Sequence, residues 1–155
     1  MNDTPIRRTD LQAAAKQVMI ENGFEPEFSP QVQQELEELK AHPPKIEPGP
    51  NIRDLRNLLW SSIDNDTSRD LDQAEVAERL PKGETKVLVA IADVDMFVSK
   101  SSAIDAHAAK ETTTVYTGVR NFPMLPEQLS TGTSSLLEAE DKLSIVVADS
   151  RGACG

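Results

Sequence analysis

Four aspartates fall within nine positions of the sequence: Asp64, Asp66, Asp70 and Asp72. Asp70 and Asp72 are two positions apart, so in an extended chain their side chains point the same way. Carboxylates brought close together repel one another unless a cation neutralises them. Oxygen ligands suit Mg²⁺ or Mn²⁺, and such ions can activate a water and stabilise the leaving oxygen of a phosphodiester. The segment is therefore a candidate site for metal-assisted hydrolysis.

Two other interpretations of this segment stay open. Composition alone favours a solvated acidic loop, because Asp and Ser are common in loops. The alternative is an EF-hand calcium loop, whose positions 1, 3, 5, 7, 9 and 12 are matched by Asp64, Asp66, Ser68, Asp70, Asp72 and Glu75. Against the EF-hand, Arg69 stands where the sharp turn of that loop requires glycine, and no second loop is present to pair with it.

The elements around the aspartates predict an α+β fold with a mixed, largely antiparallel sheet, flanking helices and a small helical arm before it. Helices are predicted near residues 10–20, from Ser29-Pro30 to Leu39, and from Ser101 or Ser102 to about Glu111. Strands are predicted over 74–80, 87–92 and 143–148, with a hairpin turn at 81–84. Residues 87–92 are a continuous apolar run and are predicted to be buried on both faces, and 143–148 is predicted to be another buried strand.

Proline composition predicts the domain boundaries. Four prolines between His42 and Pro50 forbid a helix or a central strand there. Residues 43–50 are therefore predicted to link a helical module over 1–42 to the α+β domain over 51–149, and residues 150–155 to form a disordered tail.

Charge and composition limit the function classes. The formal net charge of -10 argues against a protein whose whole surface grips nucleic acid, because phosphate binding needs a basic face. The single cysteine, Cys154, allows neither an intramolecular disulfide nor a cysteine-based zinc site. No secretory signal and no membrane-length apolar stretch is visible, so a cytoplasmic protein without a membrane partner is expected. His42 and His107 are predicted at the surface, away from the carboxylates.

An ordered series of motifs resembles the catalytic domain of the ribonuclease II (RNB) family. It begins with Asp54-Leu55-Arg56, Ile63-Asp64 and Ser68-Arg69-Asp70-Leu71-Asp72. It continues with Val89-Ala90-Ile91-Ala92-Asp93-Val94, Ser102-Ala103-Ile104-Asp105, Thr114-Val115-Tyr116, the proline-rich Phe122–Ser130 segment, Ser135-Leu136 and Glu140-Asp141-Lys142-Leu143. Each motif is weak by itself, and their order over residues 51–148 makes the resemblance strong.

The resemblance implies a function and a role for several residues. Members of the family degrade single-stranded RNA processively from the 3′ end with Mg²⁺, releasing nucleoside 5′-monophosphates, and DNA is not expected as a partner. By family role, Asp64 and Asp70 would help to hold metal, and Asp72 would be the most demanding catalytic carboxylate. Tyr116 matches the aromatic residue that stacks on a terminal base, although a half-buried strand tyrosine is an equally simple interpretation.

The chain departs from the family pattern in two ways. Gln73 stands at the fourth acidic position of the family motif, and its carbonyl can coordinate a metal but brings no charge. The family domain also extends well beyond the segment that matches at residues 51–148, so the chain is expected to stop inside it, without the later arginines and the S1-type domain. Both departures leave open a second function, a non-catalytic RNA-binding remnant.

Overall fold

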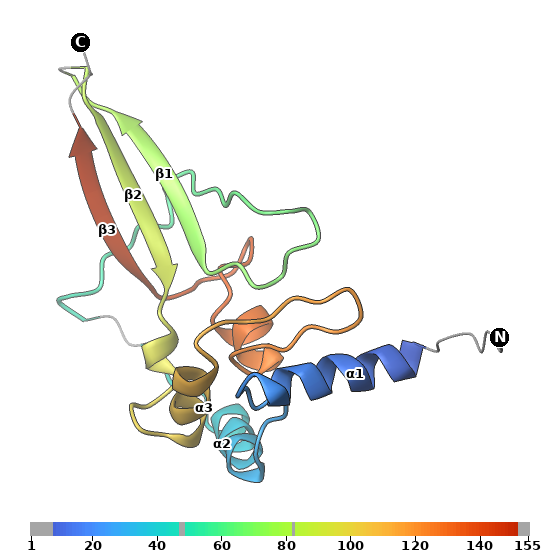
Figure 1. Cartoon of the computed structure of the whole chain (residues 1–155). Coiled ribbons are helices and arrows are strands. Elements are labelled where there is room, and N and C mark those ends of the chain that lie inside the picture. The colour runs from blue at the N-terminus through green and yellow to red at the C-terminus, as the bar shows by residue number, and fades with distance from the viewer. Residues whose placement is uncertain (1–7, 47–48, 82, 152–155) are drawn as a thin grey trace, which may run out of the picture. The chain divides into compact units, whose positions relative to one another are not determined.

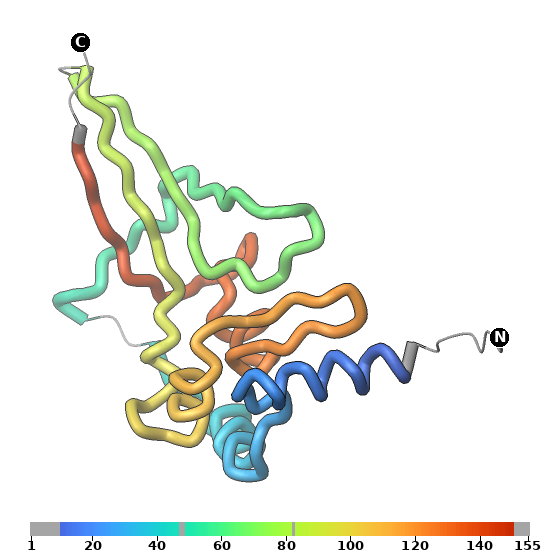
Figure 2. Tube along the Cα trace, in the orientation of Figure 1, coloured from blue at the N-terminus to red at the C-terminus, as the bar shows by residue number. Residues whose placement is uncertain are grey.

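The computed structural model describes residues 8–46, 49–81 and 83–151. The chain divides into two compact units, Met1–Pro43 with Val98–Glu127, and Pro44–Phe97 with Gln128–Gly155. Figure 2 shows the Cα trace coloured by residue number, so that the segments of each unit can be followed along the chain. No helix among the described residues has the length and apolar composition that a membrane crossing requires.

The first unit contains the helices α1 (Arg8–Glu21), α2 (Pro30–Ala41) and α3 (Ala103–Glu111). Gly23, at a φ of 88°, follows the end of α1 and has the left-handed conformation in which helices commonly end. At the start of α2, the Ser29 hydroxyl accepts the amide N–H of Val32 and Pro30 occupies the first turn, which confirms the predicted start of this helix at Ser29-Pro30. Buried apolar side chains of this unit include Met19, Val32, Leu36, Val98, Ile104 and Phe122.

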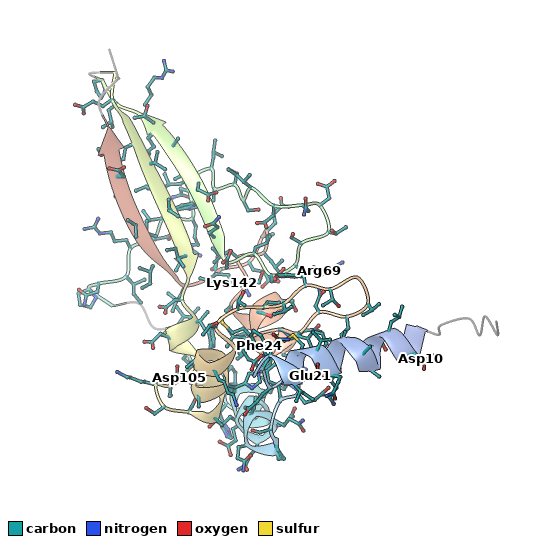
Figure 3. All side chains as sticks on the ribbon, in the orientation of Figure 1. Asp10, Glu21, Phe24, Arg69, Asp105 and Lys142 are labelled. Atoms are coloured by element: carbon teal, nitrogen blue, oxygen red, sulfur yellow. The ribbon has the colours of Figure 1, made fainter. Side chains whose placement is uncertain are left out.

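Carboxylates fix the packing of α3 within the first unit. The carboxylate of Glu35, on α2, accepts the amide N–H groups of Ala103 (2.7 Å) and Ile104 (3.0 Å). These amides lie in the first turn of α3, where N–H groups have no partner inside the helix and the helix dipole favours a negative charge. Asp105, labelled in Figure 3, accepts the amide N–H of Ser101 beside the same turn.

His107 corrects a prediction, because it is buried rather than at the surface, with 8 % of the residue exposed. Its ring lies 4.6 Å from that of Phe28, measured between centroids. Burial follows from its place on α3, since Ile104 and Glu111 on the same helix are also buried. His42 is exposed, as predicted.

The second unit contains a three-stranded antiparallel sheet in the order β1-β2-β3, shown in Figure 1. Its strands are β1 (Gln73–Arg79), β2 (Thr85–Ala92) and β3 (Ser144–Arg151). The predicted hairpin joins β1 to β2, with Arg79 opposite Thr85 and the amide N–H of Leu80 donating to the carbonyl of Glu84. A 3₁₀ turn, Val94–Met96, follows β2, and a short π-helix, Leu129–Thr133, precedes β3. These helices and this sheet confirm the predicted α+β class.

Two predictions of burial are wrong: that the strand at 87–92 (β2) is buried on both faces, and that the strand at 143–148 (β3) is buried. Leu88 and Ala90 are buried on one face of β2, but Ile91 on the opposite face is 46 % exposed. Its cross-strand neighbour Ile145 is 57 % exposed, and Val147 is 53 % exposed. An apolar run does not show how deeply each face of a strand is covered, and the face of β2 that carries Ile91 is less buried than the face that carries Leu88 and Ala90.

The predicted tail is wrong for its first two residues, because β3 includes Ser150 and Arg151, opposite Lys86 and Thr85 of β2. Residues 152–155 lie outside the described residues. The predicted division into 1–42 and 51–149, joined by a linker over 43–50, rests on the proline-rich segment and remains a prediction, whereas the compact units place residues 98–127 with α1 and α2.

Candidate metal centre

The predicted metal ligands lie on an irregular segment that leads into β1. Ser61, at the start of this segment, pairs with Glu75 of β1 through an isolated antiparallel bridge. Asp64, Asp70 and Asp72 are exposed, and Asp72 directly precedes β1. Gln73 is the first residue of the strand and is also exposed. The predicted ligands therefore belong to one loop and one strand end within the second unit.

Backbone hydrogen bonds hold the chain at Asp70 and Asp72. The carbonyl of Asp72 accepts the amide N–H of Ala92, at the end of β2, at 2.8 Å. The carbonyl of Leu71 accepts the amide N–H of Leu136 at 2.8 Å. Since Leu71 lies between the two aspartates, both of them project from an anchored stretch of backbone.

Sequence reasoning missed the structural role of Ser135, which was named only as part of the Ser135-Leu136 motif. The residue is 1 % exposed. Its hydroxyl accepts the amide N–H of Leu71 at 3.0 Å and donates to the carbonyl of Arg69 at 2.8 Å. The only signal in the sequence was the position of Ser135-Leu136 in the ordered motif series.

The side chains of the described residues do not form a three-acid metal cluster. Over residues 8–46, 49–81 and 83–151, no group of three or more His, Cys, Asp or Glu side chains is placed so that it could hold a metal ion. The donor set itself, three carboxylates and one amide oxygen, has the chemistry that Mg²⁺ prefers. The metal roles of Asp64, Asp70, Asp72 and Gln73 therefore remain predictions.

An ion-pair network joins the first family motif to the turn before β3. The Arg56 guanidinium donates to both carboxylate oxygens of Asp54, at 2.9 Å and 2.7 Å, and to Asp141 at 2.6 Å. Hydrogen bonds from the Arg56 side chain and amide lower the pKa of Asp54 from 3.8 to about 2. The same bonds to Asp54 and Asp141 raise the pKa of Arg56 further above its ordinary value. All three side chains are exposed, so solvent screens their attraction.

The EF-hand interpretation is wrong, because the residues that would form its exiting helix form β1 instead. Glu75, the twelfth position of the EF-hand pattern, pairs with Val89 in the sheet.

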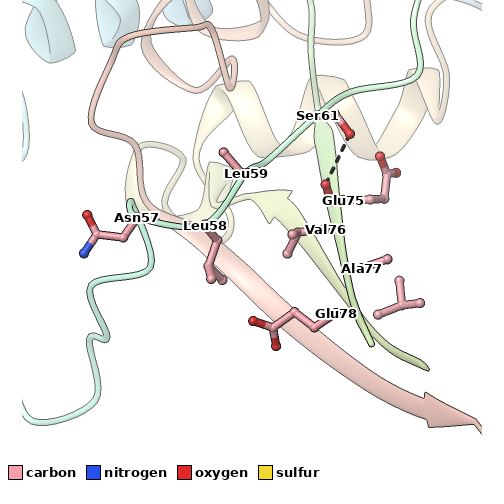
Figure 4. A pocket seen from close by; sticks show the side chains of 9 residues that line it. Asn57, Leu58, Leu59, Ser61, Glu75, Val76, Ala77 and Glu78 are labelled. Atoms are coloured by element: carbon pink, nitrogen blue, oxygen red, sulfur yellow. Dashed lines mark hydrogen bonds between the residues drawn. The ribbon is translucent and has the colours of Figure 1, made fainter. Parts of the chain in front are cut away.

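Glu75 also lines an open cavity of about 410 Å³, drawn in Figure 4. The cavity is lined by Asn57, Leu58, Leu59, Ser61, Glu75, Val76, Ala77, Glu78 and Val87.

Tyr116 belongs to the first unit, whereas the aspartates belong to the second. Next to it, Val115 and Phe122 form an isolated antiparallel bridge and exchange backbone hydrogen bonds of 2.9 Å. Tyr116 is 65 % exposed, more than a half-buried strand tyrosine would be. Its predicted contact with RNA remains a prediction.

Comparison with known proteins identifies the family of the chain. Residues 52–149 match the RNB domain. The chain is 41 % identical over 95 residues to ribonuclease R of Thermotoga maritima, covering 61 % of this chain and 13 % of that protein. It is 38 % identical over 145 residues to DIS3-like exonuclease 2 of Schizosaccharomyces pombe, covering 90 % of this chain and 15 % of that protein. The chain thus spans less than a fifth of the length of these relatives.

Solved structures agree with the sequence comparison. RNase R of Mycoplasma genitalium in complex with ribose-methylated single-stranded RNA matches 90 % of this chain and 21 % of its own, with a TM-score of 0.78 and 31 % identity. Its complex with double-stranded RNA matches with a TM-score of 0.73. Since the motif series, the fold and these matches coincide over the same residues, the chain belongs to the RNB family of exoribonucleases.

Proposed function

We propose that this chain carries the metal-binding aspartates of a cytoplasmic 3′-to-5′ exoribonuclease that hydrolyses single-stranded RNA to nucleoside 5′-monophosphates. The observation that carries the proposal is the RNB-domain match over residues 52–149, a range that includes Asp64, Asp70, Asp72 and Tyr116. A relative whose structure contains single-stranded RNA supports the choice of substrate.

The proposed roles divide the acidic residues by task. Asp64 and Asp70 hold Mg²⁺ or Mn²⁺, Asp72 is the most demanding catalytic carboxylate, and the Gln73 carbonyl adds an uncharged oxygen. A divalent cation bound here would supply an activated water and stabilise the leaving oxygen of the phosphodiester. Because like-charged carboxylates repel one another, the three side chains are expected to approach one another only once their charge is neutralised.

Tyr116 is proposed to stack on a base of the bound RNA. An aromatic ring accepts any base, because every base has a π-face, and each stack typically contributes about 1–3 kcal/mol. The 65 % exposure of Tyr116 supports this role, since a buried ring could not receive a base.

Substitution of Asp72 tests the proposal. The 155-residue chain is incubated with 5′-labelled oligo(A) and Mg²⁺, and the products are resolved on a sequencing gel. The parent is expected to shorten the RNA from its 3′ end, and Asp72→Asn is expected to abolish shortening, because the substitution removes the charge and keeps the side-chain size. Glu37→Gln on α2 is the matched control and should keep the parent rate, since it makes the same carboxylate-to-amide change outside the aspartate segment. An Asp72→Asn chain as active as the parent would contradict the assigned role.

RNA binding without hydrolysis is the second candidate function. One observation favours it: the neutral Gln73 stands at the fourth acidic position. This candidate predicts that the parent retains labelled oligo(A) in a gel-shift assay without shortening it. Gln73→Asp is then expected to increase Mg²⁺ affinity in calorimetry, because it adds a fourth charge.

A further inference from the structure

The Ser135 hydroxyl bonds to the backbone on both sides of Asp70. It accepts the amide N–H of Leu71 at 3.0 Å and donates to the carbonyl of Arg69 at 2.8 Å. Ser135 is 1 % exposed, so water does not compete for these bonds. A hydroxyl that donates and accepts at once fixes two backbone groups with one atom.

Two further bonds extend this anchorage to Asp72. Leu136, directly after Ser135, donates its amide N–H to the carbonyl of Leu71, and Ala92 donates to the carbonyl of Asp72, each at 2.8 Å. The backbone on either side of each aspartate is thereby fixed. Because a side chain leaves its backbone in a direction set by the local backbone dihedrals, these bonds also limit where the two carboxylates can reach.

Hydrogen bonds from Lys142 hold the segment that directly precedes Ser134 and Ser135. The Lys142 ammonium donates to the carbonyls of Gly132 (2.8 Å) and Thr133 (3.1 Å). These two residues end the π-helix before Ser135, and Lys142 is labelled in Figure 3. Lys142 also pairs with Glu140 at 2.8 Å, and its side chain is only 14 % exposed. The segment that presents Ser135 is therefore held in place independently of the aspartates.

We infer that Ser135 is a positioning residue, which orients Asp70 and Asp72 for the divalent cation through its hydrogen bonds to Leu71 and Arg69. The inference rests on the proposed function, because it assumes that these two carboxylates bind metal. Loss of a group that orients metal ligands typically weakens metal affinity by about 10- to 100-fold.

Ser134 provides a matched control. It is also buried, at 5 % exposure, and its hydroxyl also donates one hydrogen bond of 2.8 Å to a backbone carbonyl. That carbonyl belongs to Leu129, in the same short helix, and not to the aspartate segment. Ser134→Ala and Ser135→Ala therefore each remove one buried hydroxyl, and only Ser135→Ala removes contacts with the segment that carries Asp70.

The experiment compares the parent chain, Ser134→Ala and Ser135→Ala by three measurements. These are the dissociation constant for Mn²⁺ by calorimetry, hydrogen exchange of the Leu71 amide by NMR, and the thermal unfolding midpoint. Ser135→Ala is expected to weaken Mn²⁺ binding by roughly tenfold or more and to speed exchange at Leu71. Ser134→Ala is expected to leave Mn²⁺ binding and Leu71 exchange unchanged. Both substitutions are expected to lower the unfolding midpoint, Ser135→Ala by more because it removes two hydrogen bonds and Ser134→Ala removes one.

The outcomes separate this inference from the function on which it rests. A parent that binds no Mn²⁺ overturns the metal assignment and, with it, the positioning role. A parent that binds Mn²⁺ with an affinity that Ser135→Ala leaves unchanged overturns the positioning role alone. If Ser135→Ala does not fold, Ser135→Cys replaces it, since a thiol keeps the size but bonds weakly. Weaker Mn²⁺ binding by Ser135→Cys than by Ser134→Ala then supports the inference, and equal binding overturns it.

Discussion

At the residue scale, the Arg56 guanidinium bonds two acidic side chains at once, an arrangement called the Arg56 fork below. It bonds both oxygens of Asp54 and one of Asp141, and thereby ties the Asp54-Leu55-Arg56 motif to the turn before β3. The sequence placed all three residues in family motifs but could not reveal the pairing, because Arg56 and Asp141 are 85 positions apart. The fork predicts an altered titration of Asp54.

Removing the guanidinium should return the pKa of Asp54 towards 3.8 from about 2, because the hydrogen bonds from Arg56 favour the charged carboxylate. The pKa is measured by NMR titration of Asp54 in the parent and in Arg56→Ala. Arg53→Ala is the control, since it removes an equal charge and leaves the fork intact. A titration of Asp54 that Arg56→Ala leaves unchanged would refute the fork.

The lowered pKa of Asp54 determines the direction in which this ion pair changes the stability of the fold with pH. The folded pKa of Asp54 is below its unfolded value, so the stabilisation is present above about pH 3.8 and is lost as the pH falls towards 2. Its size is expected to be small, because the pair is exposed to solvent.

At the scale of the elements, the sheet holds the backbone at Asp72 through its bond to Ala92. The face of β2 that carries Leu88 and Ala90 is more deeply buried than the face that carries Ile91. The strands and the helices of the chain were predictable because period, caps and turn residues signal them locally. Examples are Ser29-Pro30 at the start of α2 and the hairpin before Thr85. The burial of His107 and the exposure of Ile145 were not predictable, since both depend on which distant segments cover each face. The anchorage of Leu71 by Ser135 is a long-range contact of the same kind.

The one covered face of β2 predicts a difference between two truncations on that strand. Leu88→Ala is expected to lower the free energy of unfolding by about 2–5 kcal/mol, because Leu88 is 5 % exposed and its loss leaves a cavity. Ile91→Ala, on the opposite face of the same strand, is expected to cost less than about 1 kcal/mol, because Ile91 is already 46 % exposed. Urea unfolding of both variants measures the two costs. Equal costs would mean that both faces of β2 are covered.

At the scale of the whole molecule, net charge and family membership point in different directions. A chain with a formal charge of -10 repels a polyanion such as RNA, yet it belongs to a family of exoribonucleases. The proposed divalent cations at the aspartates would reconcile the two, because they would place positive charge where phosphate must approach. The resemblance predicted the family, which the RNB-domain match confirms, whereas the roles it implies for the acidic residues remain predictions. It could not predict the geometry of their side chains, which depends on the repulsion between them.

Paramagnetic broadening by Mn²⁺ tests the central claim most directly, because the ion broadens NMR signals only in its vicinity. Sub-stoichiometric Mn²⁺ added to the ¹⁵N-labelled chain is expected to broaden the amide signals of residues 64–73 first. In Asp70→Asn/Asp72→Asn the broadening of these signals should disappear. Glu37→Gln/Glu38→Gln on α2 is the control, since it removes the same charge far along the sequence and should leave the pattern unchanged. Broadening spread evenly over all acidic segments, or unaffected by the aspartate substitutions, would contradict a metal centre at these residues.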